Sequence, residues 1–174
     1  MRQKITLWQL VGFSLTSLFG TVLHFLYEWS GQSIFAALIS GVNESTWEHM
    51  KLLYFPLFAF ALVQSLFFKG NPNFWCIKLR GIITGLILIP ILFYTYNGII
   101  GNSPDWINIS IFFIAAAAVF IYEARLLKRR DIQCREPWLA FLIICFIGVF
   151  FILFTFVTPR MGIFLDPVTG NYGI

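Results

Sequence analysis

Charged residues are scarce in this 174-residue sequence, where 12 Lys or Arg and 8 Asp or Glu make up 11% of the chain. Soluble globular domains carry about 25% charged residues, so this composition cannot cover a water-facing surface. Cysteine is rarer still, with 3 residues, which excludes a small disulfide scaffold. Intrinsic disorder is excluded because 59% of the residues are hydrophobic and the mean hydropathy is +0.81. The composition indicates a protein of the lipid bilayer.

Long apolar stretches make up most of the sequence. A membrane-spanning helix needs about 20 mainly apolar residues, and the alternating pattern of barrel strands is absent from this sequence. Stretches of sufficient length lie at residues 5–27, 45–68, 77–100, 106–127 and 137–157. We predict an all-α polytopic membrane helix bundle with five spans, a single integral membrane domain over residues 1–174 with a tail at 158–174. The apolar segment 29–42 is too short to cross and predicts a short interfacial or re-entrant helix.

Basic residues gather on one side of this predicted bundle. They precede the first span or lie between the second and third and between the fourth and fifth, as Arg2, Lys4, Lys69, Lys78, Arg80, Arg125, Lys128, Arg129, Arg130 and Arg135. Basic residues in short loops stay in the cytoplasm, so we expect the N-terminus inside and the C-terminus outside. The expected partner of this basic side is anionic lipid at the inner face. Nucleic acid is not expected, because no soluble binding module is present, and a homo-oligomer stays open.

Polar residues gather at the other ends of the first two spans. His24 and Glu28 lie four residues apart near the end of the first span, and Glu44, Glu48, His49 and Lys51 open the second. Residues four apart share one face of a helix. Because antiparallel neighbours joined by a short segment place these ends side by side, we expect a polar pocket there. A charge within a bilayer costs at least about 2.5 kcal/mol, which favours side chains that face the bundle interior.

Imidazole and carboxylate groups together suit a divalent metal such as zinc. His24, Glu28, Glu48 and His49 are the candidate metal ligands, and Glu48, Glu44 and Lys51 are the candidate catalytic residues, with a carboxylate as general base. Asp166 in the tail is a further candidate if the tail folds over the pocket. No His-Glu-x-x-His or Gly-x-Ser-x-Gly motif accompanies these residues.

The same residues also have structural interpretations. Ser45 and Glu48 match a capping box at the start of the second span, and Lys51 is suited to neutralise Glu48 or Glu44. Glu123 is expected to pair with Arg125 or Lys128 near the inner face. We expect no disulfide, because two of the cysteines, Cys76 and Cys134, fall near the predicted cytoplasmic side.

Three classes of function remain open. The first is an outward-facing pocket that binds a metal or a small polar ligand, which includes a membrane-embedded hydrolase. The second is a small transporter or proton-coupled carrier, which needs polar groups that continue through the bundle. The third is a non-catalytic membrane scaffold whose ion pairs hold the first two spans together. Whether the protein is an enzyme is therefore not decided by the sequence.

Three segments carry a resemblance to a known family, at residues 24–31, 43–51 and 166–174. The central one reads Asn-Glu-Ser-x-Trp-Glu-His-x-Lys. Together they resemble an uncharacterised family of small bacterial polytopic membrane proteins, which implies a multi-pass protein of the bacterial plasma membrane and no activity. A weaker resemblance is to intramembrane glutamate-dependent proteases, but the adjacent Glu-Glu followed by Arg of those enzymes is missing here.

Overall fold

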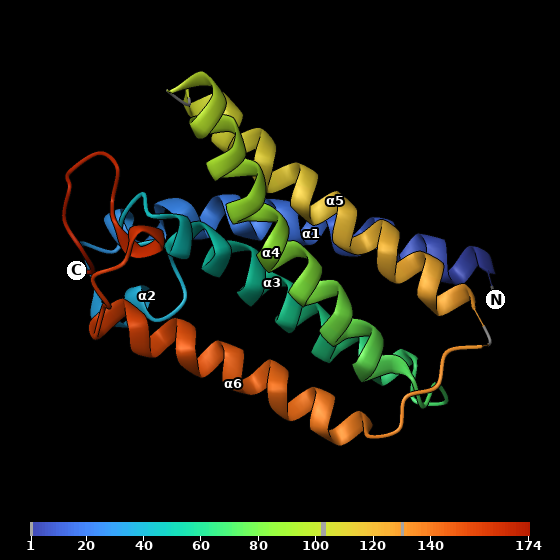
Figure 1. Ribbon diagram of the computed structural model, residues 1–174. Coiled ribbons are helices and arrows are strands. Elements are labelled where there is room, and N and C mark those ends of the chain that lie inside the picture. The colour runs from blue at the N-terminus through green and yellow to red at the C-terminus, as the bar shows by residue number, and fades with distance from the viewer. Residues whose placement is uncertain (1, 102–103, 130) are drawn as a thin grey trace.

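The computed structural model describes residues 2–101, 104–129 and 131–174. Its elements, in chain order, are α1 (Arg2–Trp29), α2 (Ile34–Ala37), α3 (Thr46–Phe67), α4 (Phe74–Ile100), α5 (Asp105–Lys128), α6 (Pro137–Phe156) and the short 3-10 helix η1 (Gly162–Phe164) (Figure 1). Five of these helices, all except α2 and η1, are long and apolar enough to cross a membrane. The predicted all-α membrane bundle is thereby confirmed, and every predicted span end lies within three residues of a helix end.

Helix α3 lies in the middle of the bundle and contacts α1, α4, α5 and α6. In its most apolar 18-residue stretch 56% of the residues are buried, against 28% in α1 and in α6. The long helices run back and forth, so the two termini lie at opposite ends of the molecule (Figure 1). We call the end near the N-terminus the basic end and the end near the C-terminus the polar end.

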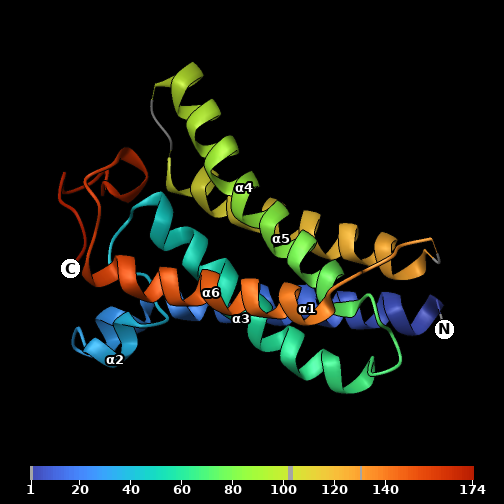
Figure 2. The same cartoon turned by 60° about the horizontal axis from the view of Figure 1, so that its bottom comes forward.

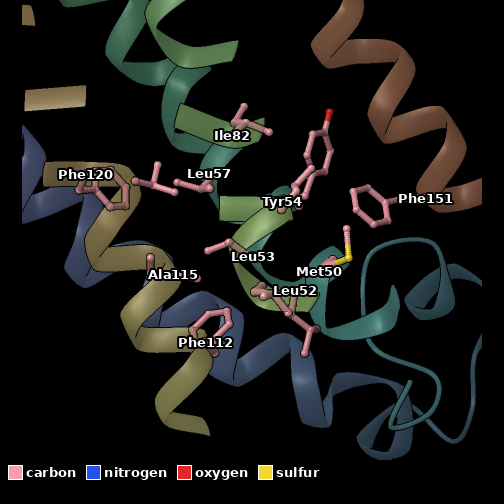
Figure 3. Packing of buried hydrophobic residues seen from close by; sticks show 14 of the residues in the cluster. Met50, Leu52, Leu53, Tyr54, Leu57, Ile82, Phe112, Ala115, Phe120 and Phe151 are labelled. Carbon is pink, nitrogen blue, oxygen red and sulfur yellow. The ribbon is translucent and has the colours of Figure 1, made fainter. Parts of the chain in front are cut away.

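The core consists of apolar side chains that α3 presents to its neighbours. Leu53 and Tyr54 are completely buried there, and Figure 3 shows them among residues of α4, α5 and α6. On α5, Ala115 and Ala116 are also completely buried. Small side chains let helices approach closely, so these alanines allow α5 to pack tightly against its neighbours.

The basic end contains two pairings that the sequence did not predict. Cys76 at the start of α4 forms a disulfide with Cys134 in the α5–α6 connection, so the expectation of no disulfide is wrong. The α5–α6 connection brings Cys134 next to Cys76. Asn73 Oδ1 accepts a hydrogen bond of 2.8 Å from the Cys134 backbone N–H and so holds this connection against the start of α4. Arg130, one of the basic residues placed on this side, lies outside the described residues.

The second pairing joins Lys78 of α4 to Glu123 of α5 at 2.5 Å, where both side chains are buried. Glu123 was expected to pair with Arg125 or Lys128, and this is wrong. The helix positions explain the difference, since Arg125 and Lys128 follow Glu123 on its own helix, whereas Lys78 faces it across the closely packed α4–α5 interface. A side chain at Gly81 would collide with Glu123, so this glycine allows the carboxylate to reach its lysine.

At the polar end, α2 and the C-terminal tail cover the ends of the spans. Helix α2 has four residues, with Phe35 83% exposed and Ala37 completely buried, and it is the short helix predicted between the first two spans. The tail packs onto the bundle through Phe164, whose ring centroid lies 4.7 Å from that of Trp47 on α3. Seen from a second direction, the end of α4 projects beyond the rest of the bundle, on the side away from α2 (Figure 2).

Candidate metal centre

Three side chains that offer metal ligands meet at the polar end. His24 lies in the last turns of α1, Glu44 lies in the connection before α3, and His49 lies in the first turn of α3. One ligand atom of each lies within 4.8 Å of the other two. His24 Nε2 is 3.7 Å from Glu44 Oε1, and His49 Nε2 is 3.5 Å from Glu44 Oε2. The group therefore combines two imidazoles and one carboxylate from two helices and a loop.

The start of α3 fixes the orientation of His49. Ser45 is the N-cap, and its hydroxyl accepts a 3.3 Å hydrogen bond from the Glu48 backbone N–H. The Ser45 carbonyl lies 3.0 Å from His49 Nδ1. Because a carbonyl can only accept, Nδ1 donates this hydrogen bond, and Nε2 is the ring nitrogen that lies next to Glu44. A backbone carbonyl on the second ring nitrogen is the usual support of a histidine that binds metal.

Asn43 fixes the loop that carries Glu44. Its Oδ1 accepts a 2.9 Å hydrogen bond from the Ser45 backbone N–H, and its Nδ2 donates to the Gly173 carbonyl of the tail at 2.9 Å. The side chain thus connects the turn before α3 to the end of the chain. Glu44 itself stays partly exposed, so its position depends on this turn.

Loss of these hydrogen bonds is expected to weaken metal binding without unfolding the bundle. We predict that Asn43→Ala lowers the affinity for zinc by about 10–100-fold, the range found when groups that support metal ligands are removed. Competition with a coloured zinc chelator, in detergent, measures this affinity. Asn71→Ala, at the turn before α4 on the basic end, is the matched control and should bind zinc like the wild type. An unchanged affinity in Asn43→Ala would contradict the supporting role.

The distances between the histidine nitrogens and the Glu44 oxygens can be compared with those in a zinc site. Two ligand atoms about 2.0–2.1 Å from a tetrahedral zinc ion lie about 3.3 Å from each other. The observed separations of 3.5 and 3.7 Å involve different oxygens of Glu44, and one ligand atom of each residue lies within 4.8 Å of the others, so the side chains would have to move together by up to about 1.5 Å to reach this geometry. Two histidines and one glutamate are also the protein ligands of a known class of catalytic zinc sites, in which the fourth position holds water.

Glu48 and Lys51, which the sequence placed among the catalytic and metal-binding candidates, lie in a different cluster. Lys51 Nζ is 2.5 Å from Glu48 Oε2, and it also donates to the Ala37 carbonyl at 3.0 Å and to Thr155 Oγ1 at 2.8 Å. The three ammonium hydrogens thus have three acceptors. These contacts connect α2, α3 and α6. Both charged side chains are buried, so the network serves to hold these helices together.

The Glu48 carboxylate has further partners in the same network. It accepts from the Val42 backbone N–H at 3.3 Å, and its Oε1 lies 3.0 Å from the Thr155 hydroxyl. The Ser45 backbone N–H donates to Asn43 instead, so only the hydroxyl half of the predicted capping box is present. The physical reason is the lysine, which competes for the carboxylate with a full charge.

Two other candidates lie outside the group of three. Glu28 is exposed in the last turn of α1, and Asp166 is buried in the tail. The Asp166 carboxylate accepts from the Val168 backbone N–H at 2.9 Å and from the Thr169 hydroxyl at 2.8 Å. These bonds stabilise the turn of the tail.

A cavity of about 860 Å³ opens beside the three ligands. His24, Glu44 and His49 form part of one wall, and the opposite wall comes from α4 and α5. The tail contributes Pro167 and Val168, so it does reach the pocket, through these residues. Sequence reasoning missed the opposite wall, namely Phe93, Asn97, Asn108, Phe112 and Phe113. The available signal was a pair of amides, Asn97 and Asn108, at the adjoining ends of two apolar spans.

The fold and its five candidate spans define a multi-pass membrane protein. Within that class, the model of a family of unknown function (DUF6512) matches residues 1–174, and the chain belongs to this family. This confirms the resemblance to an uncharacterised family that the sequence motifs indicated. Comparisons with curated proteins and with solved structures gave no match.

Proposed function

We propose that this membrane protein binds a divalent metal ion, with zinc as the first choice, through His24, Glu44 and His49. The observation that carries the proposal is the convergence of these three ligand atoms within 4.8 Å at the wall of a cavity. The hydrogen bond of His49 Nδ1 supports it, because it holds the ring and leaves Nε2 as the nitrogen for coordination. Glu44 thereby replaces Glu28 and Glu48 in the ligand set suggested by the sequence.

A metal held by three protein ligands keeps a coordination position for water or substrate, and that position would face the cavity. Zinc lowers the pKa of bound water to about 7, which makes hydroxide available as a nucleophile at neutral pH. We therefore propose hydrolysis of a bound substrate as the chemistry of the site. The role of the chain is to hold the ion beside the cavity and to orient His49 through the Ser45 carbonyl.

The arrangement of polar groups favours this proposal over a carrier. Along α3, the core residues between the buried polar Lys51 and Gln64 include Leu53, Leu57 and Phe60. The polar groups buried in the same layer are uncharged, among them the Tyr54 hydroxyl, which donates to the Ile144 carbonyl, and Thr16 on α1. A carrier would need polar groups through this layer. The scaffold hypothesis accounts well for the ion pair of Glu48 and Lys51. It does not account for two imidazoles that face one carboxylate at the edge of a cavity.

Orientation and location form part of the same proposal. The distribution of basic residues supports a basic end that faces the cytoplasm and contacts anionic lipid, so the metal centre would face outward across a bacterial plasma membrane. The Cys76–Cys134 disulfide at the basic end argues against this orientation, because disulfides are rare in the cytoplasm. Labelling of single cysteines with an impermeant reagent on intact cells would test this, in a background without the native cysteines. We expect labelling at residue 171 in the tail and none at residue 69.

Elemental analysis of the purified protein tests metal binding. We expect close to one zinc ion per chain in the wild type, and loss of the metal in His24→Asn, Glu44→Gln and His49→Asn. Glu28→Gln is the matched control, because it removes a carboxylate at the same end of α1 and should keep the metal. A folded wild type that stays free of metal after incubation with zinc, manganese and iron would disprove the proposal.

A further inference from the structure

The cavity beside the metal centre has a lining that suggests which class of molecule it takes. Its volume of about 860 Å³ falls within the range of about 300–1,000 Å³ typical of small-molecule sites. Apart from the three ligands, the larger side chains on its walls are mainly apolar, among them Phe25, Leu52, Phe93, Phe112 and Phe113. These come from α1, α3, α4 and α5, which are all candidate membrane spans. Such walls suit a hydrocarbon chain.

The charge of the cavity is concentrated at one place. Among the described residues that line it, the ionisable ones are His24, Glu44 and His49, and no Lys or Arg is present. Without metal the fixed charge there is the Glu44 carboxylate, which repels an anion. A divalent ion reverses the sign and leaves a net positive centre with an open coordination position. Anion binding in this cavity should therefore depend on the metal.

The cavity also has an opening toward the surface that would face lipid. Phe25 on α1 is 41% exposed and Ile109 on α5 is 57% exposed, and both line it. An amphipathic molecule could enter from the bilayer with its apolar chain along α5 and its polar group at the metal.

We propose that the cavity binds a lipid with an anionic headgroup, which coordinates the metal while an acyl chain lies against Phe112 and Phe113. This proposal rests on the proposed metal site and names the substrate class of that site. The lipids that fit this description share one acyl chain joined to an anionic group, either a phosphate or a carboxylate. Neutral or zwitterionic lipids lack the net charge that the metal would attract.

Lipid binding to delipidated protein in detergent tests the proposal. The probes are a monoacyl glycerol phosphate, a fatty acid of the same chain length, glycerol phosphate and a zwitterionic monoacyl phosphocholine. We expect zinc to raise the affinity for the monoacyl glycerol phosphate at least tenfold, with much weaker binding of glycerol phosphate and of the zwitterionic lipid. The fatty acid decides whether phosphate or carboxylate is the preferred headgroup.

A cavity-filling variant separates lipid binding from metal binding. Ile109→Trp places a bulky ring at the cavity wall, away from the three ligands, and should keep zinc while it loses the lipid at least tenfold. Leu18→Trp is the matched control, because Leu18 is 58% exposed on α1 and does not line the cavity. If zinc binds but does not change lipid affinity, this inference is wrong and the metal site stands. If no metal binds, both proposals are wrong.

Discussion

Lys51→Met is expected to destabilise the protein by about 3–5 kcal/mol, the typical result of removing one partner from a buried ion pair. Methionine has nearly the length of lysine, so packing changes little. The Glu48 carboxylate then keeps the Val42 N–H and the Thr155 hydroxyl but loses its counter-charge. The Ala37 carbonyl loses its lysine donor as well. Unfolding in mixed micelles of increasing denaturing detergent measures the free energy.

Two controls separate the ion pair from a general effect of losing a lysine. Lys69→Met removes an exposed lysine and should change stability by less than about 0.5 kcal/mol. The double variant Glu48→Gln with Lys51→Met should recover part of the lost stability, because no unpaired charge remains. Lys51→Met that still folds at low temperature should also keep zinc, since Lys51 belongs to the structural network. Wild-type stability in Lys51→Met, or loss of metal from the folded variant, would contradict this assignment.

The fold could be predicted from the sequence because each span is long and apolar. A stretch such as residues 137–157 has few alternatives in a bilayer, where every backbone polar group must be paired within a helix. The end of a helix could also be predicted where a capping residue marks it, as Ser45 does for α3. The disulfide between Cys76 and Cys134 was not readable, because it depends on a connection folding back onto another helix.

Only part of the candidate site could be predicted from the sequence, because the rotation of each helix about its axis was unknown. Sequence spacing places His24 and His49 at adjoining span ends, but it does not give the direction of each side chain. Glu48 and His49 are neighbours in the chain and point into different clusters, one with Lys51 and one with Glu44. Glu44 lies before the helix, so helical spacing gave no information about its direction. The cavity walls from α4 and α5 depend on tertiary packing and had only two amides as a signal.

At the polar end, the buried ion pair of Glu48 and Lys51 differs from the group formed by His24, Glu44 and His49. Glu48 and Lys51 are enclosed by backbone and hydroxyl partners, so little of their binding capacity remains. His24, Glu44 and His49 are partly exposed and border open space. Polar groups that stabilise a bundle are normally enclosed, whereas groups that bind ligands need access. This contrast is the physical basis for placing the proposed function at these three residues.

The second large effect is expected at the basic end, where Lys78→Met should lower the free energy of unfolding by about 3–5 kcal/mol. Glu123 Oε2 loses its partner, and Glu123 Oε1 is buried without a hydrogen bond already. Glu123→Gln should cost less. The Lys78 ammonium lies 5.6 Å from the ring centroids of Phe60 and Phe74 and 5.9 Å from that of Phe120. Aromatic faces attract a cation but not a carboxylate, so the lysine tolerates the loss of its partner better than the glutamate does.

A double-mutant cycle on this pair measures the coupling and the asymmetry together. Arg80→Met is the matched control, because it removes an exposed cation two residues further along α4 and should be nearly neutral. The combined Lys78→Met and Glu123→Gln variant should be more stable than Lys78→Met alone, since no charge stays buried without a partner. Equal costs for the two single variants would contradict the stabilising role of the three rings. Additive costs would contradict the ion pair itself.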